Sequence, residues 1–353
     1  MKRALFLGLF LVGCGSNVAA SGGAAGSAQG GSTTTTAGGG GAGGSEPVPG
    51  SQSLTFGPKT IAPGEENTQC IQGKLKNLEM LRVHQIHNVL SQGSHHMIVY
   101  RTADTEEKLT PYDCQPFKDT LDPSKGSPLM ITQKHDEMLT LPDNVAFTFD
   151  PEQMIRLEVH FLNATDKSID MTATTTFVPI ADADFKYEAD FLFLGDPDIK
   201  IPASSKLTLG PVFMPLGKLL PDLVPDAKFF AITGHEHQWG TRVKVDLVTD
   251  ANDPGTPVYD PANWSWAEPE TVRPDPEFSI TKDGGFKLTC EWDNKSASEV
   301  GFGESANDEM CFFWAYYYPS KGAHVCAHSE QAPQFGTDLC CPGNALCQYL
   351  LNN

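Results

Sequence analysis

The stretch MIRLEVHFL, residues 154–162, alternates between apolar and polar side chains. Residues two apart in a β-strand point to the same side, so this alternation predicts a strand with one apolar and one polar face. His160 is expected on the polar face, where a metal ligand would lie and where a histidine is otherwise solvated. The apolar face is predicted to carry Ile155, Leu157, Val159 and Phe161, and the polar face Met154, Arg156, Glu158 and His160.

Runs of the same kind recur after residue 53, separated by Pro, Gly and Asp. Several alternate with the period of two that half-buried strands show, and no amphipathic helix of three turns is apparent. The pattern favours an all-β fold of β-sandwiches over an α/β design. The clearest runs are HMIVYR (96–101), TATTTFVPI (172–180), KFFAITGHEH (228–237), TRVKVDLV (241–248), GFKLTCEW (285–292) and CFFWAYYY (311–318).

The beginning of the chain has the features of a bacterial lipoprotein signal. Lys2 and Arg3 precede a short apolar run that cannot span a bilayer as a mature helix. LVGC (11–14) resembles a lipobox, in which cleavage precedes Cys14 and its thiol carries the lipid. Residues 1–13 are therefore predicted to be a signal peptide, and the protein to be anchored to a membrane of the bacterial cell envelope, facing the periplasm or exterior. An ordinary secretory signal with an incidental Cys is the alternative.

Composition divides the rest of the chain. Residues 14–52 are almost all Gly, Ala, Ser and Thr, which predicts a flexible tether because such a segment buries too little apolar surface to fold. The remainder is predicted to form an N-terminal domain at 53–195, a C-terminal domain at 196–320 and a Cys-rich tail at 321–353. The formal net charge of −19 argues against a nucleic-acid partner, which would require a basic surface.

Two stretches pair histidines. In TGHEHQWG (233–240), His235 and His237 are two apart, so in a strand both imidazoles would lean to one side and could hold one ion. More often, two histidines at this spacing lie on a solvent-exposed strand face. In GSHHMIVY (93–100), His95 and His96 would diverge in a regular strand. They can reach one ion only at a strand end or bend, which Gly93-Ser94 could supply.

A third stretch, NDEMCFFW (307–314), places Met310 at the polar entrance to an aromatic run. Most such methionines belong to a core. The functional interpretation is a thioether ligand, which is soft and selects Cu(I).

Together, HHM (95–97), EVH (158–160), HEH (235–237) and EMC (309–311) resemble, in this order, the copper type II ascorbate-dependent monooxygenases. That family contains the peptidylglycine α-hydroxylating and dopamine β-monooxygenases. The resemblance covers residues from about 60 to 318 and is thin between the motifs. It implies two tandem jelly-roll β-sandwich domains that face each other across a solvent-filled cleft, with one copper ion on each.

The resemblance also implies the ligands and the chemistry. The first copper would pass electrons from ascorbate or another one-electron reductant, and the second would bind O2, so that a substrate C–H bond is hydroxylated. Glu236 would be structural. The first ion would be held by His95, His96 and His160, and the second, catalytic ion by His235, His237 and Met310.

Three positions depart from the peptidylglycine enzymes. Their carboxylate-binding Arg corresponds to Thr233, and their substrate-contacting Asn and Tyr correspond to Phe312 and Trp314. An Arg guanidinium can donate two hydrogen bonds to one carboxylate. Its loss therefore disfavours a peptidylglycine substrate. A small apolar or aromatic substrate is expected instead, bound by Thr233, Phe312 and Trp314.

Eight cysteines remain if Cys14 is lipidated, and an even count in an exported chain indicates disulfides. The resemblance implies Cys70–Cys114 and Cys290–Cys311. Two further disulfides are expected in the tail, with a zinc site that uses His324 and His328 as the alternative. The tail cysteines are Cys326, Cys340, Cys341 and Cys347.

The main competing function is a non-catalytic copper-binding lipoprotein that transfers electrons. It would have the same ligands. Substrate-dependent oxygen consumption in the presence of ascorbate separates it from a monooxygenase.

Overall fold

The computed structural model describes residues 48–114, 126–303, 305–330 and 337–342, and hydrogen-bonded strands account for most of these described residues. Residues 1–47, with the predicted signal peptide and Cys14, lie outside the described residues, as do most of the tether and Cys347. The longest described helix, α1 (Leu216–Leu219), has four residues. No described helix has the length and apolar character needed to cross a membrane.

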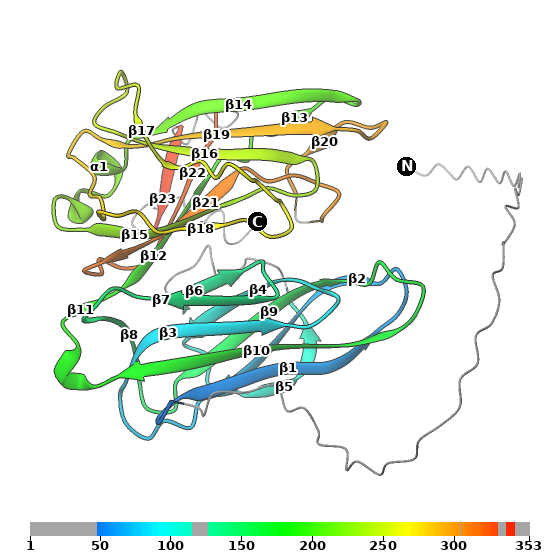
Figure 1. Ribbon diagram of the computed structural model, residues 1–353, viewed down its shortest axis with the longest axis vertical. Helices are drawn as coiled ribbons and strands as arrows, with labels where there is room; N and C mark the ends of the chain where they lie inside the picture. The colour runs from blue at the N-terminus through cyan, green and yellow to red at the C-terminus, as the bar shows by residue number, and fades with distance from the viewer. Residues whose placement is uncertain (1–47, 115–125, 304, 331–336, 343–353) are drawn as a thin grey trace, which may run out of the picture. The chain divides into compact units, whose positions relative to one another are not determined.

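Two sheets make up the first half of the described chain (Figure 1). They share one hydrophobic core, so they form a β-sandwich. One sheet has the order β1-β10-β3-β8-β11 with β7 beside β3, and the other has the order β5-β2-β9-β4-β6. The first contains β1 (Gln52–Ile61), β3 (Leu81–Leu90), β7 (Asp136–Thr140), β8 (Val145–Phe149), β10 (Ile169–Ile180) and β11 (Tyr187–Glu188); the second contains β2 (Glu66–Lys74), β4 (Ser94–Thr102), β5 (Lys108–Asp113), β6 (Gly126–Thr132) and β9 (Met154–Leu162).

The second half repeats this plan around a second core. Its sheets have the orders β18-β15-β21-β12-β22-β23 and β14-β19-β16-β17, beside the short pair β13-β20. The strands of the first sheet are β12 (Asp190–Gly195), β15 (Lys228–His235), β18 (Thr271–Val272), β21 (Phe312–Tyr318), β22 (His324–His328) and β23 (Asp338–Cys341). The other elements of the second half are β13 (Lys200–Ile201), β14 (Ser205–Met214), β16 (Gly240–Val248), β17 (Thr256–Tyr259), β19 (Gly285–Asn294), β20 (Val300–Gly301) and η2 (Pro221–Leu223). In the first half, η1 (Asp182–Asp184) lies between β10 and β11.

The prediction of an all-β fold is confirmed. Strand pairing also shows where the two halves meet. β11 ends at Glu188 and pairs with β8, whereas β12 begins at Asp190 and pairs with β21. β12, assigned from the sequence to the first domain, therefore belongs to a sheet of the second half.

Part of the predicted tail also belongs to this sheet. β22 pairs with β12, and β23 pairs with β22. A disulfide joins Cys326 to Cys340 across β22 and β23, and Cys341 is disulfide-bonded too. Because disulfide sulfurs cannot serve as thiolate ligands, the zinc alternative is wrong for this pair. Cys70–Cys114 likewise forms a disulfide, which joins β2 to the end of β5.

Strand β9 follows the predicted alternation, but both of its faces are covered. Ile155, Leu157, Val159 and Phe161 lie in the first core. On the other face, the Arg156 guanidinium lies 4.2 Å from the centre of the Tyr100 ring, and the Tyr100 hydroxyl donates to Glu158 at 3.1 Å. The polar face is buried because its charged groups have partners within the sheet.

Candidate metal centre

The adjacent histidines His95 and His96 approach each other because of an irregularity in β4. Ser94 pairs with Phe161 on β9 and His96 pairs with His160, so His95 is an extra residue in the ladder. Such a bulge bends a strand and redirects its side chains. Gly93, just before it, has a φ of +92°, a value that favours glycine. The predicted bend is therefore present as a bulge.

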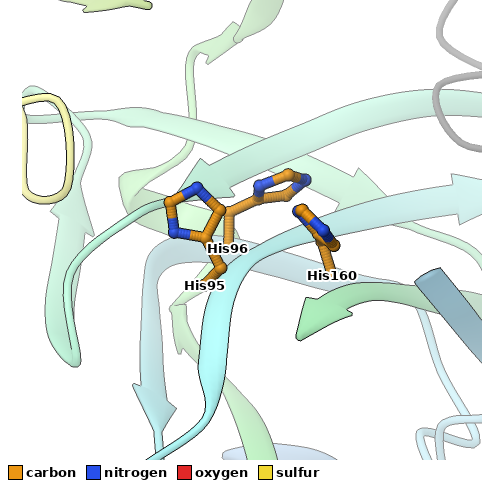
Figure 2. A group of neighbouring side chains, drawn as sticks. All are labelled: His95, His96 and His160. Atoms are coloured by element: carbon orange, nitrogen blue, oxygen red, sulfur yellow. The ribbon is translucent and has the colours of Figure 1, made fainter. Parts of the chain in front are cut away.

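The bulge brings three imidazoles together, as Figure 2 shows. One nitrogen from each of His95, His96 and His160 lies within 4.8 Å of the others. Imidazole nitrogens bind metal ions at about 2 Å, so small side-chain rotations allow all three to reach one ion. The structure thus assembles the predicted first ligand group.

A carboxylate orients one ring of this group. The Nε2–H of His160 donates to Glu66 Oε1 at 3.0 Å, because a carboxylate oxygen accepts. The Nδ1 lone pair of His160 is then available to a metal ion. Glu66 Oε1 also accepts from the backbone N of Ala306, at 3.4 Å, in the loop that leads to Met310.

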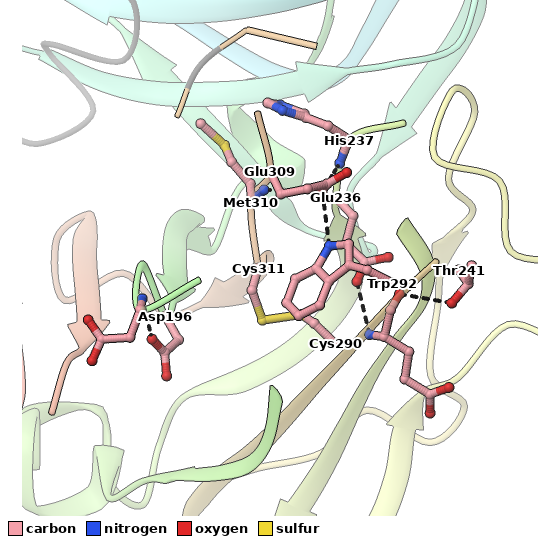
Figure 3. The surroundings of a disulfide bond; sticks show 11 residues. Asp196, Glu236, His237, Thr241, Cys290, Trp292, Glu309, Met310 and Cys311 are labelled. Atoms are coloured by element: carbon pink, nitrogen blue, oxygen red, sulfur yellow. Dashed lines mark hydrogen bonds between the residues drawn. A yellow bond between two sulfur atoms is a disulfide. The ribbon is translucent and has the colours of Figure 1, made fainter. Parts of the chain in front are cut away.

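The predicted second ligand group, which consists of His235, His237 and Met310, lies where β15 ends and β21 begins. His235 pairs with Phe312 across these antiparallel strands, and continuing this register places His237 opposite Met310. The ring centres of His235 and His237 are 5.1 Å apart. Figure 3 shows the Met310 and His237 side chains extending to the same side. The disulfide Cys290–Cys311 ties the residue after Met310 to β19, so the thioether has a fixed base.

A buried carboxylate connects the segments of this second group. Glu309 Oε2 accepts from the backbone N of His237 at 2.9 Å and from the indole Nε1 of Trp292 at 3.0 Å (Figure 3). Its Oε1 accepts from the backbone N of Trp239 at 2.7 Å. Glu309, the residue before Met310, therefore joins its own segment to the loop after β15 and to the strand β19. Glu236, predicted to be structural, accepts from the backbone N of Glu291 on β19 at 3.2 Å.

Hydrogen bonds also set which nitrogen each ring of the second group offers. The Nδ1–H of His237 donates to the carbonyl oxygen of Asp308 at 3.2 Å, and that of His235 donates to Gln133 Oε1 at 2.7 Å. Both rings then present the Nε2 lone pair. The Nε2 of His235 is buried and has no hydrogen-bond partner among the described residues. An unpaired buried imidazole nitrogen, in the same predicted ligand group as the Met310 thioether, fits a soft metal ion such as Cu(I).

Burial holds all these imidazoles in the neutral form that binds metal. Burial, with a smaller effect of the neighbouring histidines, lowers the pKa of His95 to about 3, and burial lowers the pKa of His237 to about 4. Burial also sets the pKa of His96 and of His235 well below the usual value. The pKa of His160 is lowered by burial, against the opposing effect of Glu66.

The two ligand groups lie beside each other. The ring centres of His96 and His235 are 6.3 Å apart, and Trp266 from the second half lies 5.3 Å from His95. His96 and His235 are each 3% exposed. The solvent-filled cleft implied by the resemblance is therefore closed at this point. β12 and β21 carry aromatic residues on the face turned away from the second core. These residues pack into the first core and so hold the cleft closed.

The three predicted substrate-binding residues lie next to the second group but are buried. Trp314 is 2% exposed, with its ring centre 6.1 Å from that of His235, and Phe312 stacks on Phe193 at 5.0 Å. Thr233 donates to Thr271, which donates to Glu137. A cavity of about 240 Å³ adjoins this chain of hydroxyls and is lined by residues that include Thr271, Glu137, Arg273 and Tyr316.

Sequence reasoning missed the groups that orient the ligands. Glu66 and Gln133 are ordinary polar residues at strand ends, and no spacing in the sequence relates them to histidines far along the chain. Glu309 did stand within the EMC motif, directly before the predicted ligand Met310. Its position beside an apolar run was the only signal for its role.

Comparison with known proteins agrees with this geometry. Residues 220–337 match the family model described as copper type II ascorbate-dependent monooxygenase, C-terminal domain. The match includes His235, His237 and Met310. No curated protein matches the chain. Over residues 220–337, the chain is thus similar to the C-terminal domain of the copper type II ascorbate-dependent monooxygenases.

Proposed function

We propose that this protein is a copper-dependent monooxygenase that hydroxylates a C–H bond of a small organic substrate, using O2 and a one-electron reductant such as ascorbate. The supporting observation is the pair of buried, neutral imidazole groups, one of which ends beside a thioether. Imidazoles alone suit an ion that alternates between oxidation states, and two imidazoles with a thioether favour Cu(I). We infer two copper ions per chain, one for each group.

Copper, when bound, would supply one-electron chemistry and a position for O2. The chain contributes orientation and the exclusion of water. Glu66 and Asp308 fix the proton positions of His160 and His237. The rings of His96 and His235, whose centres are 6.3 Å apart, would give a short route through the protein between the two groups.

For the substrate, we infer an apolar or aromatic molecule rather than a glycine-extended peptide. The Thr233 hydroxyl is already bonded to Thr271, and threonine at this position lacks the guanidinium that would pair with a carboxylate. The aromatic side chains of Phe312 and Trp314 lie beside the second group.

Copper stoichiometry and oxygen uptake test the proposal. We expect two copper ions per wild-type chain, and ascorbate-dependent oxygen uptake that a member of a panel of aromatic amines stimulates. Met310→Ala is expected to weaken Cu(I) binding at the second group by at least about 100-fold, more than the loss of an outer partner causes. Met171→Ala, which removes a buried methionine from the first core, is the matched control. One copper or none in the wild type would contradict the proposal, and faster turnover of glycine-extended peptides would contradict the substrate class.

Burial of Thr233, Phe312 and Trp314 favours one competing function, a copper-binding protein that transfers electrons without hydroxylating a substrate. Such a protein needs close metal sites and no substrate pocket beside them. Two bound copper ions with no substrate-stimulated oxygen uptake across the panel would support it.

We also propose that the protein is anchored by lipid at Cys14 to a membrane of the bacterial cell envelope. The lipobox-like LVGC at residues 11–14 supports this. Labelling with a fatty-acid analogue is expected to mark the wild type and not Cys14→Ala. Equal labelling of both proteins would rule the anchor out.

A further inference from the structure

One end of the sheet β5-β2-β9-β4-β6 carries three polar residues in a row. His160 on β9 pairs with His96 on β4, and on the other side of β4, Met97 pairs with Thr132. The next position in that register places Gln133, the residue directly after β6, opposite His96. Residues that oppose each other across antiparallel strands point to the same face. Gln133 therefore continues the row that supplies two ligands of the first group.

Gln133, however, serves the second group. Its Oε1 accepts from His235 Nδ1 at 2.7 Å, and the two side chains are 5% and 3% exposed. Its Nε2 has no hydrogen-bond partner among the described residues, so the carboxamide is held by its contact with His235. The strand β6 is anchored nearby, where Asn88 Nδ2 donates to Thr132 Oγ1 at 2.6 Å. The acceptor is thus presented by a fixed strand end.

The bond has a chemical consequence for His235. With Nδ1 committed as a donor, the ring offers Nε2, the atom left without a partner. Of the two rings in the second group, His237 receives this control from its own half of the chain, through Asp308. For His235, the acceptor that fixes the tautomer is Gln133, which belongs to the first half of the chain.

We propose that Gln133 is a positioning residue for the second metal group, so that this group is complete only when the sheet of the first half lies against it. The inference rests on the proposed function for the identity of the metal, but not for the hydrogen bond itself. It links the two groups: the sheet end that carries His96 and His160 also sets the tautomer of His235. Separation of the halves would release His235 and weaken the second group.

The first experiment reads the tautomer directly in the metal-free full chain. Long-range ¹H–¹⁵N spectra of histidine-labelled protein at neutral pH are expected to show His235 protonated at Nδ1 in the wild type. Gln133→Met, which has a similar shape and no acceptor, is expected to shift the ring toward protonation at Nε2 or a mixture. Gln133→Glu keeps an acceptor and is expected to retain the Nδ1–H form. An unchanged tautomer in Gln133→Met would overturn the proposal.

The second experiment measures Cu(I) affinity by competition with a coloured chelator. Gln133→Met is expected to lose about 10- to 100-fold at the second group, as is typical when an outer partner of a ligand is removed. Gln133→Glu is expected to bind at least as tightly as the wild type. The matched control is Gln153→Met, since Gln153 is also buried but bonds to the backbone oxygens of Thr102 and Met154.

The outcomes separate the inference from the proposed function. If the wild type binds no copper while the tautomer depends on Gln133, the proposed function fails and the positioning role stands. If the Cu(I) affinity of Gln133→Met equals that of the wild type, or if Gln133→Glu loses as much Cu(I) affinity as Gln133→Met, the positioning role fails and the proposed function stands.

Discussion

His96→Ala is expected to lower the copper content from two ions to one per chain, with the loss confined to the first group. His95 and His160 alone would leave that ion with two protein ligands. Because outer partners already contribute about 10- to 100-fold to affinity, loss of a direct ligand is expected to cost at least about 100-fold. Metal analysis after dialysis measures the stoichiometry, and the Cu(II) electron paramagnetic resonance signal shows which environment disappears.

His84→Ala is the control for this variant. His84 lies on β3, is half-buried, and uses its Nδ1 for the carbonyl oxygen of Val145 at 2.9 Å, away from both groups. It is expected to retain both ions. Two ions in His96→Ala would remove His96 from the ligand set. Loss of both ions would show that the histidines, in contact through His96 and His235, act as one site.

Sequence periodicity was sufficient to predict the all-β class and the core face of β9. The alternation in residues 154–162 placed Ile155, Leu157, Val159 and Phe161 on the core face, where they lie. Periodicity reports only which side of a strand is apolar, so it could not show that the polar face is also covered. That depends on the pairing of β9 with β4, which brings Tyr100 to Arg156 and Glu158.

The candidate ligands could be named from the sequence because motifs are local, whereas the groups that orient them depend on register. A shift of one residue would turn every side chain of a strand to the opposite face. The bulge at His95 and the position of Gln133 opposite His96 are both consequences of register. The closed contact between the halves was equally unpredictable, because it depends on which face of β12 and β21 packs into the first core.

Glu309→Ala is expected to destabilise the metal-free protein by about 3 kcal/mol or more. The Glu309 side chain is fully buried and is the acceptor for the backbone N–H groups of His237 and Trp239 and for the indole N–H of Trp292. Each buried donor left without a partner costs about 1–3 kcal/mol. A typical domain is stable by about 5–15 kcal/mol, so the loss would remove much of the total.

Glu309→Gln tests whether the acceptors themselves are responsible. The amide has almost the same shape but replaces one acceptor with an NH2 group, which would face a backbone or indole N–H. Its expected cost lies between zero and that of alanine. Denaturation by guanidinium chloride under oxidising conditions, followed by circular dichroism, measures both variants.

Glu291→Ala is the matched control. Glu291 lies nearby on β19, but its carboxylate is partly exposed and pairs with Arg242 at 3.0 Å. Such surface pairs contribute about 0–1 kcal/mol. If Glu309→Ala cost no more than this control, the hydrogen bonds at Glu309 would not hold His237 and Met310 in place. A cost several times larger, reduced in Glu309→Gln, would show that one buried carboxylate joins the loop after β15, the strand β19 and Met310 into a rigid support for the second group.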